Sequence, residues 1–173
     1  MPGLVRVSLT WIAGSVRRWL NGVTAMARSN LPLLFVYGTL IGDSDHPIAR
    51  LLAANGRRIA RGSIAGRLYI VPDPTDATNS YPGAMPCGNP QERVHGEVHE
   101  ITGDRAALFA KLDHYEVCSP DFPEPHEFLR RRVSVELETG GSLKAMCYLY
   151  TWDVSRARHI ASGRYVDVLE RVG

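Results

Sequence analysis

The sequence predicts an α+β fold, a small mixed β-barrel or strongly curled sheet with flanking helices. Three observations predict it: short apolar or alternating runs typical of strands, two helical segments among them, and glycine- or proline-rich loops between these elements. A length of 173 residues, 45% of them hydrophobic, is enough for one core. We therefore expect one principal domain.

The first expected strand covers residues 33–37, a continuous apolar run rich in β-formers that Gly38 closes. A short helix is expected over residues 47–54. The pair Asn55-Gly56 follows it directly and is typical of a helix C-cap.

Residues 57–71 indicate a strand pair or one long bent strand, with Gly62 and Gly66 as expected bulge positions. Residues 72–90 contain many prolines and turn formers, so we expect mostly loop there. Within that loop, residues 81–85 are expected to be extended.

Residues 93–101 alternate in polarity and predict a half-exposed strand with valines on one face. Residues 102–116 predict a helix that Asp104 can cap, and its expected apolar face consists of Leu108, Leu112 and Tyr115. A proline-rich loop is expected over residues 117–126. Residues 133–137 and 145–152 then predict a hairpin that turns at Gly140-Gly141.

The charge is unevenly distributed. The formal net charge is +2, yet all 18 acidic residues lie at or after Asp43 and four arginines are the only charged side chains in the first thirty positions. Residues 31–173 are therefore mildly acidic, with 16 basic and 18 acidic side chains. This balance argues against a nucleic-acid-binding surface.

Residues 1–30 predict a basic amphipathic segment outside the core, because Ile12, Val16, Trp19, Leu20 and Val23 recur at helical spacing. Three interpretations remain open: a membrane-surface helix, an organelle-targeting presequence, or a dispensable extension with translation starting at Met26. We expect the domain proper to comprise residues 31–173.

The cysteines and the hydropathy pattern bear on the cellular compartment of the protein. The three cysteines, Cys87, Cys118 and Cys147, are widely spaced and form no Cys-x-x-Cys pair, so neither a disulfide framework nor a zinc knuckle is expected. A reducing, cytoplasmic location fits this pattern. No run of eighteen apolar residues exists, so no integral membrane segment is expected.

Two motifs could form a site. Gly38, directly after the first strand, lets the chain turn tightly so that consecutive N–H groups can bind a carboxylate or oxyanion. From spacing alone, a simple strand-ending turn is the favoured interpretation. Glu116 ends the longer helix, beside Tyr115 and Val117. There both the helix dipole and apolar neighbours should raise its pKa, as proton shuttling near neutral pH requires. A solvent-facing glutamate is the alternative.

Two further patterns are weaker. His95, Glu97 and His99 share one strand face and have suitable chemistry for a divalent metal, but lack a remote fourth ligand, so a solvated strand face is the competing interpretation. Cys118, with His114 or His126 nearby, is a candidate thiol nucleophile, but nothing in the sequence indicates its activation. We expect no metal site.

Together, the segments Phe35-Val36-Tyr37-Gly38-Thr39-Leu40 and Leu112-Asp113-His114-Tyr115-Glu116, about 75 residues apart, resemble the gamma-glutamylcyclotransferase-like superfamily, in its avirulence-induced-gene-like or gamma-glutamylamine cyclotransferase-like branch. Further similar segments are Gly66-Arg67-Leu68-Tyr69, Tyr81-Pro82-Gly83, residues 94–98, and the pattern Phe128-x-Arg130-x-x-Val133-x-Val135. The resemblance covers roughly residues 33–168.

The resemblance implies a small mixed β-barrel with flanking helices and a cofactor-independent release of 5-oxoproline from a small γ-glutamyl amine or peptide. It implies that Tyr37, Gly38, Thr39 and Leu40 bind the substrate carboxylate. It also implies that Glu116 is the general acid and base. We expect no cofactor, no nucleic-acid partner, and a monomer or homodimer.

This sequence departs from the family at two positions. Val117 stands where relatives often have a small residue, and Phe128 stands where tyrosine is usual. The second departure puts the identity of the substrate in question more than the type of reaction. A non-catalytic module that binds a small molecule or protein with the same cavity is the alternative function.

Overall fold

The structure, a computed structural model, describes residues 32–41, 46–76 and 78–166. The amphipathic segment expected within residues 1–30 lies outside the described residues, so it and the domain boundary after it stay predictions. No helix in the described part of the chain is long and apolar enough to cross a membrane.

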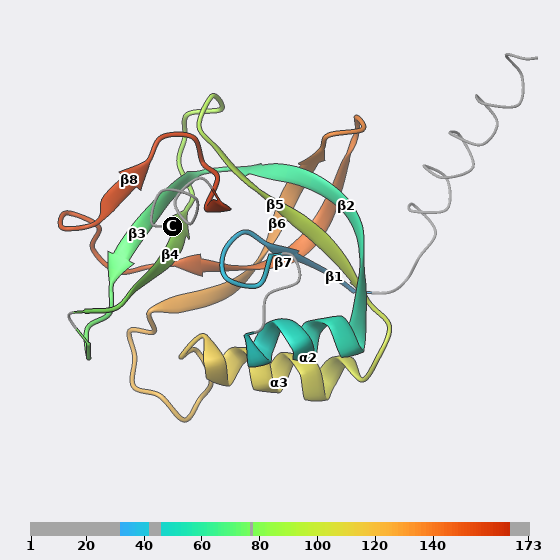
Figure 1. Cartoon of the computed structure of the whole chain (residues 1–173), viewed down its shortest axis with the longest axis horizontal. Coiled ribbons are helices and arrows are strands. Elements are labelled where there is room, and N and C mark those ends of the chain that lie inside the picture. The colour runs from blue at the N-terminus through green and yellow to red at the C-terminus, as the bar shows by residue number, and fades with distance from the viewer. Residues whose placement is uncertain (1–31, 42–45, 77, 167–173) are drawn as a thin grey trace, which may run out of the picture. The chain divides into compact units, whose positions relative to one another are not determined.

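Five strands close into a barrel in the order β1–β5–β2–β6–β7 (Figure 1). They are β1 (Leu33–Val36), β2 (Gly56–Ala65), β5 (Arg93–Ile101), β6 (Phe128–Leu137) and β7 (Ser142–Tyr150). Neighbouring strands are antiparallel except for β1 and β7, which pair in parallel. The predicted α+β fold with a mixed barrel is therefore confirmed.

The barrel interior is packed with side chains from all five strands. Its buried members include Phe35, Val98, Ile64, Val135 and Cys147, each at most 3% exposed. Alternating side chains of each strand point inward, so period-two patterning in the sequence is what forms this core. The predicted hairpin is confirmed as β6 and β7, which turn at Gly140 and Gly141 with φ of 91° and 81°.

A second, three-stranded antiparallel sheet has the order β4–β3–β8, formed by β3 (Arg67–Pro72), β4 (Ser80–Met85) and β8 (Arg158–Ile160). The chain leaves the barrel for this sheet at Gly66, where an added Cβ would lie 2.6 Å from the carbonyl oxygen of Met85. The bulge expected at Gly62 is wrong, because the register of β2 shifts between Arg58 and Ala60.

Two helices, α2 (Pro47–Asn55) and α3 (Arg105–Tyr115), lie side by side next to the barrel (Figure 1). Leu52 of α2 and Leu112 of α3 are at most 1% exposed and belong to one cluster with Leu34 and Val36 of β1. The helices therefore cover the outer face of β1. This packing fixes the position of the C-terminal end of α3, which bears Glu116.

Two local expectations about the helices are wrong. Gly56 is extended (φ −159°) and begins β2, so it is no left-handed cap for α2. Tyr115 is 39% exposed, and Phe109 takes its place on the buried face of α3. The predicted cap of α3 is confirmed, because the Asp104 carboxylate accepts a hydrogen bond from the N–H of Ala107 at 3.0 Å.

Candidate active site

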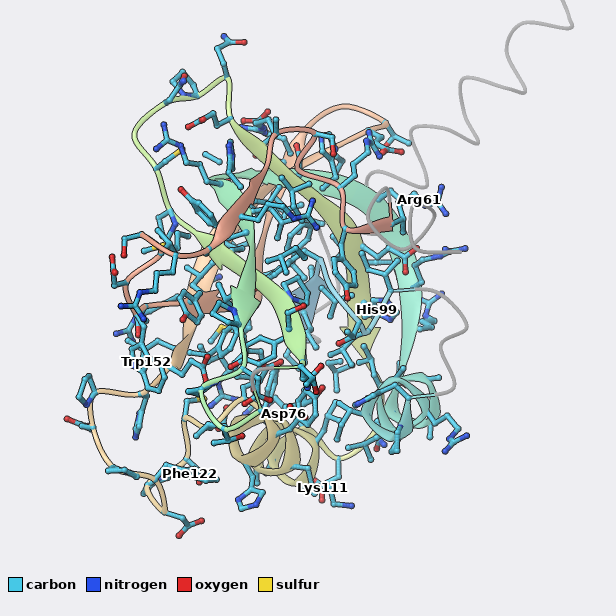
Figure 2. All side chains as sticks on the ribbon, turned by 60° about the vertical axis from the view of Figure 1, so that its left-hand side comes forward. Arg61, Asp76, His99, Lys111, Phe122 and Trp152 are labelled. Carbon is cyan, nitrogen blue, oxygen red and sulfur yellow. The ribbon has the colours of Figure 1, made fainter. Side chains whose placement is uncertain are left out.

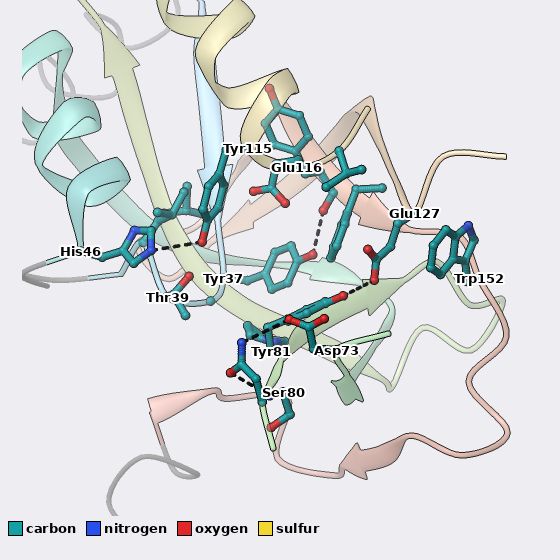
Figure 3. A pocket seen from close by; sticks show the side chains of 18 of the residues that line it. Tyr37, Thr39, His46, Asp73, Ser80, Tyr81, Tyr115, Glu116, Glu127 and Trp152 are labelled. Atoms are coloured by element: carbon teal, nitrogen blue, oxygen red, sulfur yellow. Dashed lines mark hydrogen bonds between the residues drawn. The ribbon is translucent and has the colours of Figure 1, made fainter. Parts of the chain in front are cut away.

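A cavity of about 690 Å³ lies where segments far apart in the sequence meet (Figure 3). Its walls come from the loop after β1, the chain around the start of β4, the end of α3, the start of β6 and the end of β7. Tyr37, Gly38, Thr39, Leu40 and Glu116, the site residues expected from the sequence, all line it. Their roles stay predictions.

The loop after β1 presents backbone to the cavity. The N–H of Ile41 donates to the carbonyl of Gly38 at 3.0 Å, which closes a tight turn. Among the described residues, no acceptor receives the N–H of Thr39 or Leu40. Gly38 is required for the close approach to β4, because an added Cβ would lie 2.5 Å from Cγ of Pro82.

Tyr37 anchors this loop from inside the barrel. Its hydroxyl donates to the carbonyl of Tyr148 in β7 at 2.8 Å and accepts the N–H of Ala84 in β4 at 3.1 Å. One buried hydroxyl therefore ties the strand before the loop to the barrel and to the second sheet. Such fully satisfied buried hydrogen bonds rigidify a site.

The end of α3 aims Glu116 into the cavity. The N–H of Cys118 donates to the carbonyl of Asp113, and the N–H of Val117 to that of His114, the pattern of a Schellman motif. Val117 occupies its left-handed position with φ of 53°. The chain thus reverses directly after Glu116, and the carboxylate points into the cavity above Tyr37 (Figure 3).

The pKa of Glu116 is raised to about 8. Burial is the main cause, followed by the negative charges of Glu127 and Asp113. The raised pKa agrees with the direction that the sequence predicts, but the dominant cause is loss of solvent around this half-buried side chain. A carboxyl group with this pKa is suited to both accept and return a proton near neutral pH.

A hydrogen-bonded group holds the end of α3 against the barrel. Asp113 accepts the hydroxyl proton of Tyr148 at 2.7 Å and contacts Nη2 of Arg130 at 3.3 Å. The Arg130 guanidinium also lies 4.3 Å from the ring centroid of Phe109. These contacts join α3 to β6 and β7 and fix the position of Glu116.

The sequence analysis missed a second carboxylate in the cavity. Glu127, directly before β6, lines the wall and is only 5% exposed, and the hydroxyl of Tyr81 donates to it. Burial raises the pKa of Glu127, and the charge of Asp73 contributes. No local pattern distinguishes Glu127 from Glu124 in the same proline-rich loop, so only the fold reveals it.

His46 and Tyr115 are also missed residues of the cavity wall. His46 caps α2, with Nδ1 accepting the N–H of Ile48 at 3.3 Å, and its Nε2 lies 3.3 Å from the hydroxyl of Tyr115. These two rings join the start of α2 to the end of α3.

The strand face of His95, Glu97 and His99, a weaker candidate site, lies outside the cavity wall. Glu97 is 3% exposed and contacts Arg58 and Arg61, so the expected solvated strand face is wrong at this residue. Figure 2 shows Arg61 and His99 on one side of the molecule and Trp152, a cavity residue, on the other. In the part of the chain that the structure describes, no group of three side chains is arranged to hold a metal.

The thiol of Cys118 has no activating environment. Burial, together with the charges of Asp113 and Glu116, raises its pKa to about 11. A thiol with this pKa is almost entirely protonated at neutral pH and therefore a poor nucleophile. Nearby His114 packs instead on the ring of Phe122, with 5.0 Å between ring centroids.

Comparison with known families gives one match that spans most of the chain. Residues 34–167 match the family described as gamma-glutamyl cyclotransferase, AIG2-like. The matched range contains both the loop after β1 and the end of α3. No curated protein gives a significant match.

Solved structures share the fold. An uncharacterised protein of Pyrococcus horikoshii is 18% identical with a TM-score of 0.53, over 82% of this chain and 95% of its own. The YtfP protein of Escherichia coli is 28% identical with a TM-score of 0.50, over 79% and 97%. An AIG2-like protein from Mus musculus is 22% identical with a TM-score of 0.52, over 74% and 82%.

Proposed function

The chain belongs to the gamma-glutamyl cyclotransferase, AIG2-like family, and on this basis we propose that it releases 5-oxoproline from a γ-glutamyl amine or peptide without a cofactor. The observation that carries the proposal is the placement of Glu116, with its raised pKa, in the same cavity as the loop of Tyr37, Gly38, Thr39 and Leu40. A titratable group and anion-binding backbone donors are what this reaction needs.

The loop after β1 binds the α-carboxylate of the substrate in this proposal. The N–H groups of Thr39 and Leu40 supply the donors, because neither meets an acceptor among the residues described. Consecutive backbone N–H groups in a turn form an anion-binding concavity. Gly38 has no side chain and therefore lets this turn lie close to Pro82.

Glu116 carries the proton. The α-amino nitrogen of the substrate attacks its own γ-carbonyl carbon and forms a five-membered lactam. The Glu116 carboxylate accepts the proton that this nitrogen loses and returns it to the departing nitrogen as the amide C–N bond breaks. The products are 5-oxoproline and the free amine, and Glu116 ends in its starting state.

Both reacting groups belong to one substrate molecule, so proximity is built into the substrate. The enzyme has to fold the γ-glutamyl chain, stabilise the negative charge that develops on the carbonyl oxygen, and move one proton. This chemistry requires neither an enzyme nucleophile nor a metal. A cytoplasmic location and a monomeric or homodimeric state stay predictions.

Incubation of the full chain with a panel of γ-glutamyl dipeptides and γ-glutamyl amines, including γ-glutamyl-ε-lysine, tests the proposal. We expect 5-oxoproline and the free amine in equal amounts from at least one compound. Binding measured by calorimetry without any release of 5-oxoproline would contradict it and favour the alternative, a non-catalytic binding module with the same cavity.

A further inference from the structure

One end of the cavity is acidic and aromatic. Its wall contains Glu127, Tyr81, Asp73 and Trp152. Although the chain has 20 lysines and arginines, none is among the described residues that line the cavity. Among the described lining residues, this end of the cavity therefore carries acidic side chains and no lysine or arginine.

Glu127 is the buried group at this end. It is 5% exposed, and Tyr81 donates to its Oε1. Its second oxygen, Oε2, receives no hydrogen bond from any described residue, and no described cation is paired with it. A buried carboxylate without a counter-ion is costly, and a bound cation would remove that cost.

The position of Glu127 in the cavity indicates which part of the substrate it would contact. In Figure 3, Glu127 and Trp152 lie on the opposite side of Glu116 from Thr39 and His46. A γ-glutamyl compound whose α-carboxylate binds at Thr39, and whose γ-carbonyl lies beside Glu116, would extend its leaving amine toward Glu127. The acidic end is then the pocket for the leaving group.

We propose that Glu127 selects the leaving amine, and that the preferred substrates are γ-glutamyl derivatives of amines that carry a second, positively charged ammonium group, such as diamines. This inference rests on the proposed function. The ammonium donates to Oε2 of Glu127, while the methylene chain packs on Tyr81, Phe128 and Trp152, all in the cavity wall.

Three synthetic substrates of equal length test this selection. The cationic compound is the mono-γ-glutamyl derivative of a four-carbon diamine. In the neutral compound, the derivative of pentylamine, a terminal methyl replaces the ammonium. In the anionic compound, the derivative of the corresponding ω-amino acid, a carboxylate replaces it. The wild-type chain should show kcat/KM roughly tenfold to hundredfold higher for the cationic compound than for the neutral one, as expected for one charge-assisted hydrogen bond.

Glu127→Gln should abolish this preference: measured at one pH, the kcat/KM values of the cationic and the neutral compound should agree to within about threefold, because the variant has no charge to pair with the ammonium. Tyr81→Phe keeps the ring but removes the hydroxyl that orients Glu127, so it should reduce the preference partly. Glu124→Gln is the matched control, since this exposed glutamate lies three residues away, outside the cavity wall; it should retain the full preference.

A wild-type chain that releases 5-oxoproline from all three compounds equally would overturn the inference while the proposed function stands. An equal loss for all three in Glu127→Gln would also overturn it, because Glu127 would then act on the shared γ-glutamyl part. If none of the three is turned over although another compound of the γ-glutamyl panel is, the inference is overturned and the proposed function stands; if no compound at all is turned over, the proposed function fails. Calorimetric binding then decides: tighter binding of the cationic compound, lost in Glu127→Gln, supports the selection, and equal affinities overturn it.

Discussion

Glu116 and Glu127 face one cavity from two different elements, and the negative charge of Glu127 contributes to the raised pKa of Glu116. The two residues are separated by a proline-rich loop in the sequence. Their proximity therefore depends on the way α3 and β6 end and begin at the same side of the barrel. This proximity adds to the effect of burial, which is the larger cause of the raised pKa of Glu116.

The activity should depend on pH through Glu116. Its carboxylate must be ionised to accept a proton, so kcat/KM should rise with pH and level off above a midpoint of about 8. Glu127→Gln removes a neighbouring negative charge and should lower this midpoint. Measurement of 5-oxoproline release between about pH 6 and pH 9.5 checks both expectations. A flat profile in the wild-type chain would contradict the assignment.

The same group should affect stability. The folded chain holds a proton on Glu116 up to a pKa of about 8, whereas the unfolded chain loses it near the ordinary glutamate pKa of 4.5. Between these values the folded state binds more protons, so this contribution to stability falls as pH rises. Relative to wild type, Glu116→Gln should gain on the order of 2–4 kcal/mol near pH 9 and little near pH 5. Urea unfolding at both values measures the difference; equal gains would contradict it.

Gly38→Ala should damage the loop. The new Cβ would lie 2.5 Å from Cγ of Pro82, whose ring cannot move aside without shifting β4. We expect a loss of about 1–3 kcal/mol in the free energy of unfolding and a higher KM, since the loop donors shift. Gly88→Ala is the matched control, because nothing lies within 4 Å of its added Cβ. A neutral effect of Gly38→Ala on both stability and KM would show that the close approach is unimportant.

Val117→Gly should stabilise the protein. Val117 is 36% exposed and holds φ of 53°, a conformation unfavourable for a β-branched residue and easy for glycine. The free energy of unfolding should rise by roughly 0.5–1.5 kcal/mol. This is the cost of the left-handed conformation for valine, reduced by the larger backbone entropy that glycine loses on folding. Thermal unfolding followed by circular dichroism measures it. A loss of stability would mean that the apolar contacts of Val117 outweigh its backbone conformation.

Much of the fold could be predicted because local patterns determine it. The alternating residues of β6 and β7 with two glycines between them specify the hairpin, and Asp104 specifies the start of α3. The short strand β8 escaped prediction because three residues carry no readable period. The break at Gly66 was ambiguous because a bulge and a change of sheet have the same local signal.

Only the parts of the candidate site that lie in sequence motifs could be predicted. The loop of Gly38 and the helix end at Glu116 follow from a strand-ending glycine and a helix-terminal carboxylate, and the resemblance joined them. Glu127 and His46 enter the cavity only because distant segments meet there. The burial of Glu97 was missed because its neighbours on β2, Arg58 and Arg61, are brought beside it by strand pairing.

The most direct test of the account is the turnover of Glu116→Gln at a pH near 8. With a γ-glutamyl amine that the wild-type chain converts, we expect the variant to bind with similar affinity in calorimetry but to release 5-oxoproline about a hundredfold to ten-thousandfold more slowly. Glu124→Gln, which alters an exposed carboxylate, should retain wild-type turnover. Near-normal 5-oxoproline release by a folded Glu116→Gln variant would contradict the central claim that Glu116 moves the proton.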